Sequence, residues 1–328
     1  MNHEDDVSKN ALTTMLYLLQ LREKEDMAKM LSDLEQELRL SNRFFPNTKL
    51  TDIIRSLTPS SSLTIKKGTV LFRCRLITKE DEHKFLDPFI HCLQLLFENF
   101  IPSSTINSIE QKKLQLSIYL DKHPEEIPRL QKLLRQFTAT HSISSFWGYD
   151  AAGSDAPPSN LASSGRINPD GISYLYTATD IQTAILEVRP IPTQYVSIAQ
   201  IELLEDITLY SFTSTIELEE EAKNLLSIIK YEEISKYFSQ PNYGGKSYYL
   251  ATQYISEYIK HMKDSNGQPL FDGLCFRSSL NPNGKNYALF DVSSTKKYQI
   301  CNSSLYQVSD LLGNATRLLP IEKVHNHQ

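Results

Sequence analysis

The distribution of glycine divides this chain into two parts. Ten of its eleven glycines follow Trp147, and Gly68 is the only one before it. A segment poor in glycine suits helices, whereas glycine permits the tight turns that join strands. The sequence therefore predicts a helix-rich part before Trp147 and a part built from strands and turns after it.

Apolar residues at helical spacing dominate the part before Trp147. They recur over residues 12–19 and again over residues 27–38, on either side of a charged break at residues 22–26. A short helix is expected at residues 50–57, and the Pro and Ser residues at 59–62 indicate a linker. Three further helices are expected between residues 87 and 137, with breaks at 102–104 and 122–124.

One strand is expected inside this helical part. Thr69 to Arg75 alternates and is rich in strand-forming residues, which places Arg73 and Arg75 on one face and Cys74 on the other. Residues 147–166 then form a segment rich in Gly, Ala, Ser and Pro without periodicity. Beyond it we expect strands at 174–178, 195–203, 207–212, 273–277 and 287–292, and helices at 179–188, 214–238 and 248–262. Capping boxes at Thr179–Gln182 and Ser214–Glu217 predict the starts of the first two helices.

Charge argues against nucleic acid as a partner. The chain has 34 Lys and Arg against 39 Asp and Glu, a net charge of −5, whereas a protein that neutralises phosphates normally has a basic surplus. The longest apolar-rich stretch, residues 89–101, is too short to cross a bilayer. The polar, acidic start lacks the regions of a signal peptide. We therefore expect a cytoplasmic protein that binds neither nucleic acid nor membrane.

Neither a metal site nor a Rossmann-type dinucleotide site is indicated. The four cysteines lie far apart at positions 74, 92, 275 and 301 and form no CxxC pair. The pattern GxGxxG is absent. We therefore expect no bound metal.

One constellation of residues suits a ligand that contains phosphate and a flat ring. Arg166 lies between Gly165 and Gly171 in the segment GRINPDG, and its guanidinium is a planar, permanently charged fork suited to phosphate. Tyr176 follows on a strand and can stack on a ring. Glu187 lies on the next helix beside its apolar stripe, where a carboxylate can be partly desolvated. Taken singly, these residues also suit a surface arginine, a core tyrosine and a solvated glutamate.

Together these motifs resemble the RES-domain family, named for its Arg, Glu and Ser. The resemblance rests on GRINPDG at 165–171, Tyr-Leu-Tyr at 174–176 and TAILEVRP at 183–190. It covers residues 147–292 and extends back to the strand around Phe72. The family consists of toxin-like bacterial enzymes that degrade NAD, and the helices before residue 147 resemble the additions of a longer subgroup.

The resemblance implies an α+β fold with a mixed, split sheet similar to that of ADP-ribosyltransferases. It implies a helical N-terminal region at residues 1–62, a RES-like catalytic domain at 63–310 and a tail at 311–328. Within the catalytic domain, a helical insertion at about residues 80–140 would follow the first strand, and the core would occupy about residues 147–300.

The resemblance also implies roles for the constellation. Arg166 would hold the pyrophosphate of NAD, with Arg73 as a second arginine, and Tyr176 would stack on nicotinamide or ribose. Glu187 would stabilise an oxocarbenium-like transition state and orient the ribose hydroxyls. Gly165 and Asn168 would complete the turn that contacts the ligand.

The serine of the family corresponds to Ser278, which would hydrogen-bond the carboxamide or ribose. Arg277 replaces the proline that precedes this serine in the family, so Ser279 is the alternative register.

The function implied is that of a toxin or defence effector that cleaves the nicotinamide–ribose bond of NAD, with water or phosphate as acceptor. NAD is then a substrate, and no cofactor or metal is expected. Two alternatives stand beside it: an ADP-ribosyltransferase that modifies a protein or nucleotide, and a non-enzymatic module that binds a partner. An antitoxin or regulatory protein is a further candidate partner, as is a second copy of the chain through the N-terminal helices.

Overall fold

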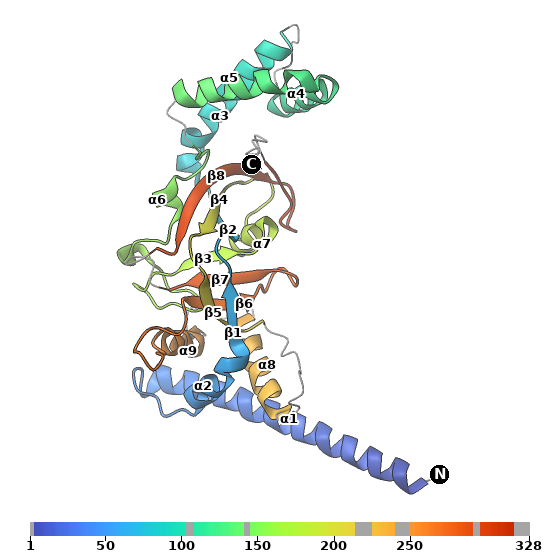
Figure 1. Cartoon of the computed structure of the whole chain (residues 1–328), viewed down its shortest axis with the longest axis vertical. Coiled ribbons are helices and arrows are strands. Elements are labelled where there is room, and N and C mark those ends of the chain that lie inside the picture. The colour runs from blue at the N-terminus through green and yellow to red at the C-terminus, as the bar shows by residue number, and fades with distance from the viewer. Residues whose placement is uncertain are drawn as a thin grey trace. The chain divides into compact units, whose positions relative to one another are not determined.

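The computed structural model describes residues 3–102, 106, 108–140, 145–213, 225–239, 249–290 and 296–317. The chain forms two compact units. Unit 1 comprises residues 1–71, 156–183 and 202–299, and unit 2 comprises residues 72–155, 184–201 and 300–328. Both contain helices together with strands of a mixed sheet (Figure 1), which confirms the predicted α+β class. The domain boundaries expected at residues 62 and 310 stay a prediction.

Unit 1 contains five strands in the order β1, β5, β6, β7, β3. Their bounds are Ser62–Ile65, Ile207–Ser211, Gly273–Arg277, Lys285–Leu289 and Leu175–Ala178. β5 and β6 run parallel, and the other neighbouring pairs run antiparallel. β6 has the bounds that the sequence predicts.

Four helices accompany these strands in unit 1: α1 (His3–Leu40), α2 (Leu50–Ser61), α8 (Leu225–Ser239) and α9 (Leu250–Lys260). They gather beside β1, β5 and β6 (Figure 1). The apolar stripe of α1 is buried in one core cluster with residues of the strands and of α8. Full burial of one such apolar side chain stabilises the folded state by about 1.5–3 kcal/mol. The members of this cluster include Met27, Leu31, Leu34, Leu38, Ile167, Tyr174, Phe212 and Phe238.

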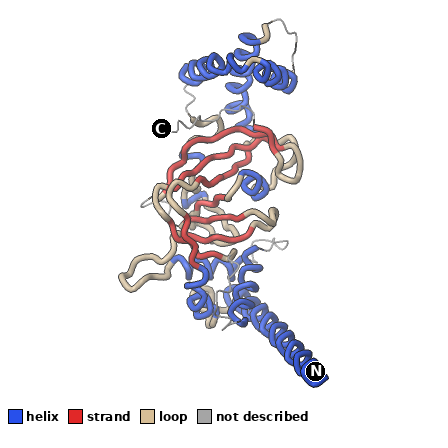
Figure 2. Tube along the Cα trace, turned by 45° about the vertical axis from the view of Figure 1, so that its right-hand side comes forward, coloured by secondary structure: helices blue, strands red, loops and turns tan. Residues whose placement is uncertain are grey.

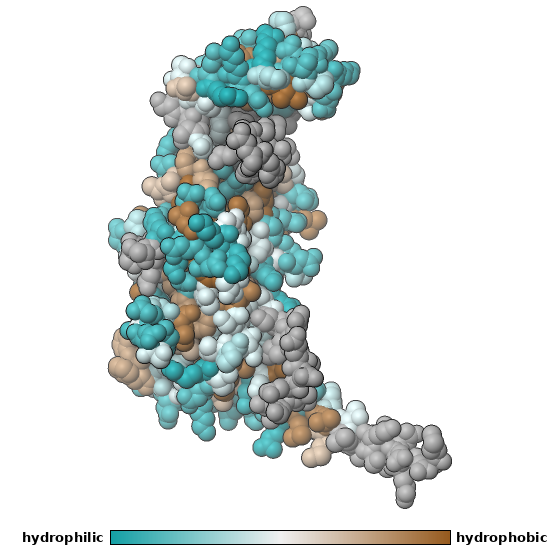
Figure 3. All heavy atoms as spheres, viewed as in Figure 1, coloured by the Kyte–Doolittle hydropathy of each residue, from teal (hydrophilic) through white to brown (hydrophobic). Residues whose placement is uncertain are grey.

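The charged break expected in the first helix does not occur. α1 runs without interruption, because charged residues with long side chains are good helix formers. Within the expected break, Arg22 Nε and Asp26 Oδ2 lie 3.9 Å apart, and an ion pair at i,i+4 spacing favours a helix. The large apolar residues from Met15 to Leu21 are exposed, whereas Met27, Leu31, Leu34 and Leu38 after the break are buried. The exposed set is Met15, Leu16, Tyr17, Leu18, Leu19 and Leu21. Figure 3 shows a brown, hydrophobic patch on α1.

The linker expected at residues 59–62 is also wrong. α2 continues through Pro59 to Ser61, and β1 begins at the next residue. Proline disfavours a helix interior, but Pro59 lies in the last turn of α2. Its missing N–H leaves one carbonyl, that of Arg55, without its usual helical donor, and the helix ends two residues after Pro59.

Unit 2 holds most of the four strands β2 (Val70–Leu76), β4 (Tyr195–Leu203), β8 (Tyr298–Val308) and β9 (Ala315–Arg317), which neighbour one another in that order. β4 has the predicted bounds, whereas β8 and β9 were not expected. The alternation of β8 is obscured because Ser303 and Ser304 are buried where apolar residues would mark a strand. The Ser303 hydroxyl accepts from the backbone N–H of Gly148 over 3.0 Å, which explains a buried hydroxyl there, and its backbone carbonyl accepts from the N–H of Trp147.

The helical insertion follows β2 within unit 2, as predicted. It consists of α3 (Lys79–Phe100), α4 (Ile109–Lys122) and α5 (Ile127–Thr140), with a 3-10 turn at Pro124–Glu126 (Figure 2). Its core includes Phe85, Phe89, Leu93, Leu96 and Phe137. No helix in the described part of the chain is long and apolar enough to cross a membrane.

Three short helices complete the fold. α6 (Ala151–Ser154) and a 3-10 turn at Ser159–Leu161 interrupt the segment that lacks periodicity, and α7 (Ile181–Glu187) follows β3. The capping box expected at Ser214–Glu217 lies outside the described residues.

Candidate active site

The segment 165–168 is a closed turn in unit 1. The backbone N–H of Gly165 donates to the carbonyl of Asn168 over 2.9 Å. The Asn168 side chain is almost fully buried, and its Nδ2 donates to the carbonyls of Ser163 (3.0 Å) and Ile172 (2.9 Å). One amide thus satisfies backbone groups on both sides of the turn, which holds the loop that carries Arg166.

Tyr176, on β3, contacts the same turn. Its hydroxyl donates to Oδ1 of Asn168 over 2.6 Å. A Cβ atom on Gly165 would lie 2.5 Å from that Oδ1 and 2.9 Å from the Tyr176 hydroxyl oxygen. Position 165 is therefore restricted to glycine by the close approach of these two side chains. The hydroxyl of Tyr176 supports the turn, and the stacking role expected for its ring stays a prediction.

Helix α9 supplies further contacts to the turn. The Thr252 hydroxyl donates to the carbonyl of Arg166 over 2.5 Å. Gln253 Nε2 donates to the carbonyls of Gly165 (2.8 Å) and Asn168 (3.1 Å). The sequence did not predict that either residue contributes to the site. The available signal was that Thr252 and Gln253 are polar yet share the buried side of a helix with Ile255 and Ile259.

The guanidinium of Arg166 is half-buried and has two oriented hydrogen bonds. Nη1 donates to the carbonyl of Phe238 at the end of α8 over 2.7 Å, and Nη2 donates to the Ser279 hydroxyl over 3.3 Å. The Phe276 ring lies below it, with 5.8 Å between Cζ and the ring centroid. A guanidinium carries more N–H donors than these two bonds use. The group is thus pre-oriented while retaining donors for an anion.

The two candidate serines differ in what they contact. Ser279 lies beside Arg166. Ser278 is 6% exposed, and its Oγ accepts from the backbone N–H groups of Leu280 (3.2 Å) and Asn281 (3.1 Å). Ser278 therefore shapes the turn after β6, whereas Ser279 is the serine that the structure brings to Arg166.

That turn is also connected to the start of α7. Asn281 Nδ2 donates to the Thr183 hydroxyl (2.8 Å), which donates to Asp180 Oδ2 (2.6 Å). Gly284 is required here, because a Cβ atom would lie 2.1 Å from Thr183 Oγ1.

The capping box expected at Thr179–Gln182 is wrong in its register. α7 begins at Ile181, and Asp180 caps it by accepting from the backbone N–H of Thr183 over 2.8 Å. Desolvation raises the pKa of Asp180, but hydrogen bonds from the side chain and backbone of Thr183 outweigh it, so the pKa lies below its usual value. Asp180 is therefore ionised at neutral pH and suited to a helix N-terminus.

Glu187 and Arg73 belong to unit 2. Glu187 is the last residue of α7 and is exposed, so the partial desolvation expected for it is not found. Arg73 is half-buried on β2. Their participation in one site with Arg166 stays a prediction. Among the described residues, no group of three or more His, Cys, Asp and Glu side chains is placed to hold a metal ion.

Comparison with known proteins identifies the family of this chain. A family model described as the RES domain matches residues 137–305, which are 169 of the 328 residues. The chain belongs to the RES-domain family. The matched segment contains the turn of Arg166, the strand of Tyr176, Glu187 and both candidate serines. No curated protein and no solved structure matches the chain.

Proposed function

We propose that this protein is an NAD-degrading enzyme that cleaves the nicotinamide–ribose bond and passes the ADP-ribosyl group to water or phosphate. The observation that carries the proposal is the pre-oriented guanidinium of Arg166. It is held through Phe238 and Ser279 in a turn that Asn168, Tyr176 and Gln253 brace. Such a turn suits a pyrophosphate, and the chain belongs to the RES-domain family.

Each candidate residue has a role in binding or cleavage of NAD in this proposal. Arg166 binds the pyrophosphate, with Arg73 as a second cation. Tyr176 contacts the nicotinamide or ribose, and Ser279 or Ser278 hydrogen-bonds the carboxamide or ribose. Glu187 stabilises the positive charge that develops on the ribose.

The bond between C1′ of the ribose and the pyridinium nitrogen breaks, and its electron pair stays on that nitrogen, which leaves as neutral nicotinamide. The oxocarbenium-like ribose is then captured by an oxygen of water, which loses a proton, or of phosphate. No redox step is needed, so NAD is a substrate and not a cofactor.

The proposal extends to the cellular setting. An enzyme that consumes NAD harms the cell that makes it, so we propose a toxin or defence role in the cytoplasm, with an antitoxin or regulatory protein that restrains it. Self-association through the N-terminal helices is part of the same proposal. It is supported by the apolar residues that α1 exposes between Met15 and Leu21. The mass of the purified chain in solution tests it.

The decisive experiment is an NAD consumption assay with identification of the products, with and without phosphate. Nicotinamide with free ADP-ribose indicates water as acceptor, and ADP-ribose phosphate indicates phosphate. Label from NAD on a macromolecule in a lysate would instead indicate a transferase. Intact NAD after prolonged incubation would contradict the proposal and favour a non-enzymatic module.

Variants assign the activity to the site. Arg166→Ala and Glu187→Ala are each expected to lower the rate roughly a hundredfold or more, since both groups act on charge in the bound substrate. Arg129→Ala and Glu126→Ala are matched controls, because these residues form a surface ion pair with each other over 3.4 Å in the helical insertion. Activity at the wild-type level in the first two variants would refute the assignment.

A further inference from the structure

The carbonyl that orients Arg166 belongs to the last turn of α8. The last four carbonyls of a helix lack partners within the helix, and a cation there is favoured both as a hydrogen-bond donor and by the helix dipole. Arg166 occupies this position through the 2.7 Å bond from Nη1 to the Phe238 carbonyl. The orientation of the guanidinium therefore depends on where the last turn of α8 lies.

Two neighbouring side chains fix that turn from different directions. The Phe238 ring is fully buried and stacks on Phe212, with ring centroids 4.0 Å apart. The Tyr237 hydroxyl donates to Oε2 of Glu35, on α1, over 3.0 Å. The N-terminal helix thus reaches the residue that precedes the carbonyl bonded by Arg166.

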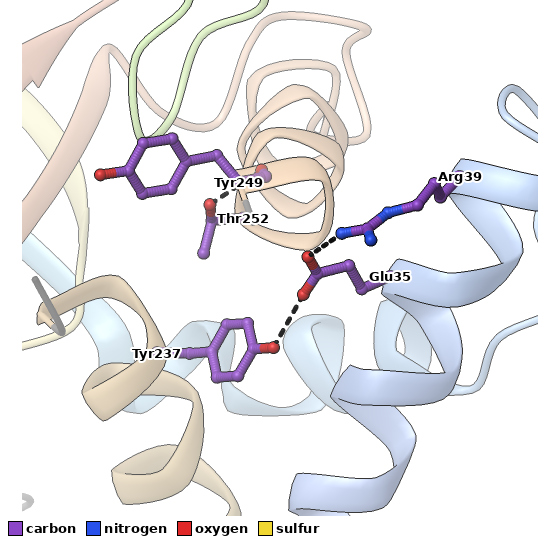
Figure 4. Close-up of polar contacts among 5 residues, drawn as sticks. All are labelled: Glu35, Arg39, Tyr237, Tyr249 and Thr252. Carbon is purple, nitrogen blue, oxygen red and sulfur yellow. Dashed lines mark hydrogen bonds and ion pairs between the residues drawn. The ribbon is translucent and has the colours of Figure 1, made fainter. Parts of the chain in front are cut away.

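The contact between Glu35 and Tyr237 is not an ordinary surface hydrogen bond. Glu35 is 7% exposed, and Arg39 Nη2 donates to its other oxygen over 3.2 Å (Figure 4). A hydrogen bond to a buried carboxylate is stronger than one between neutral groups, and removing either partner leaves polar atoms that water cannot easily reach. Burial and the nearby Glu35 raise the pKa of Tyr237 to about 12, so its hydroxyl remains a donor at neutral pH.

We propose that α1 positions the substrate-binding arginine: Glu35 holds Tyr237, Tyr237 holds the last turn of α8, and the Phe238 carbonyl of that turn orients Arg166. Glu35 and Tyr237 are thus positioning residues that act through Arg166. The consequence for NAD binding rests on the function proposed above. The arrangement gives the N-terminal region, which lies outside the matched family segment, a defined effect on the site.

The same two helices supply a control. Glu23 of α1 pairs with Lys230 of α8 over 3.1 Å. This contact also joins α1 to α8, but it lies two turns of helix before Phe238. If α1 merely docks on α8, loss of either contact should have a similar effect. If the last turn is what matters, only loss of the contact between Glu35 and Tyr237 should affect Arg166.

The test uses the full chain with Tyr237→Phe, Glu35→Gln and the control Glu23→Gln. The first readout is the side-chain Nε–Hε NMR signal of Arg166, assigned by its loss in Arg166→Lys. This signal should shift or broaden in the first two variants and stay in place in the control. The second readout is kinetic: KM for NAD should rise roughly three- to tenfold in the first two variants with kcat within about twofold, as for an interaction that serves binding.

The outcomes separate this inference from the proposed function. An Arg166 signal unchanged in folded Tyr237→Phe and Glu35→Gln would overturn the positioning role, as would an equal change in Glu23→Gln. A wild-type chain that leaves NAD intact would overturn the proposed function, while the NMR signal would still decide whether α1 positions Arg166. If Glu35→Gln fails to fold, Tyr237→Phe, which keeps the ring, carries the test.

Discussion

The Tyr176 hydroxyl donates a 2.6 Å hydrogen bond to Oδ1 of Asn168 and thereby ties strand β3 to the turn that carries Arg166. Two residues that family resemblance assigns to ligand binding therefore contact each other directly. Their first effect is on the shape of the turn, and substitutions can separate that effect from direct contact with a substrate.

Tyr176→Phe should destabilise the fold and weaken NAD binding. The variant keeps the ring but leaves the buried Oδ1 of Asn168 without this donor, which costs about 1–3 kcal/mol. Denaturant unfolding would measure the loss of stability, and KM for NAD the effect on the site. If Tyr176 acts by stacking alone, Tyr176→Phe will retain wild-type stability and KM, and the role in the turn is then wrong.

Gly165→Ala adds a single methyl group but should distort the turn of Arg166 strongly. The added methyl group would lie 2.5 Å from Asn168 Oδ1 and 2.9 Å from the Tyr176 hydroxyl oxygen, so that hydrogen bond must open. We expect a loss of about 1–3 kcal/mol in unfolding free energy and a strong loss of NAD cleavage.

Gly267→Ala is the control for that variant. Gly267 has a φ of +78° and no atom within 4 Å of an added Cβ, so its cost is backbone strain of about 1–2 kcal/mol. It should lose stability but keep its activity. Equal loss of activity in both variants would mean that reduced stability, and not the shape of the turn, explains the effect of Gly165→Ala.

Substitution of the two serines distinguishes their roles. Ser279→Ala removes the acceptor for Arg166 Nη2, so KM for NAD should rise while stability stays within about 0.5 kcal/mol of wild type. Ser278→Ala removes the acceptor of two backbone N–H groups and should cost about 1–2 kcal/mol in stability. The reverse pattern in unfolding and kinetic measurements would identify Ser278 as the residue that contacts the ligand.

Asp180→Ala should destabilise the chain in a manner that depends on pH. The pKa of Asp180 is lowered in the folded state from 3.8, so its ionised form contributes stability above that value, and the contribution is lost as the pH falls through the lower folded pKa. We expect a cost of about 1 kcal/mol at pH 7, as for loss of a helix cap, and a smaller difference below about pH 3.8. Unfolding curves at pH 3 and pH 7 would measure this, and a difference that grows on acidification would contradict it.

The sequence predicts the parts of this fold that depend on local pattern. β4 and β6 have the expected bounds because their apolar residues are nearly continuous, and the turn around Arg166 is recognisable because Gly165 and Asn168 lie in one short motif. The sequence does not predict β8, because buried serines interrupt its apolar pattern. It predicts the helical character of the first forty residues but places a break within α1, because a charged segment separates two apolar stretches.

The contacts of Arg166 and of the turn that carries it could not be predicted for a different reason. Phe238, Thr252 and Gln253 lie more than seventy positions away along the chain, and nothing in their own segments indicates which loop they meet. Such pairings depend on how α8 and α9 pack. The spacing of apolar residues indicates which face of a helix is buried, but not which segment that face contacts. The choice between Ser278 and Ser279 likewise required the actual geometry of the turn after β6.

The burial of Met27, Leu31, Leu34 and Leu38 of α1 in one cluster with Ile167 and Tyr174 bears on how this protein can be divided. The segment that matches the family begins at residue 137, yet the apolar surface of the cluster that contains Ile167 is covered in part by a helix that ends at Leu40. A polypeptide trimmed to residues 137–305 would expose that surface to water and should aggregate. The family segment and the part of the chain that folds therefore differ in this protein, and a fragment designed to keep the turn of Arg166 should also keep α1.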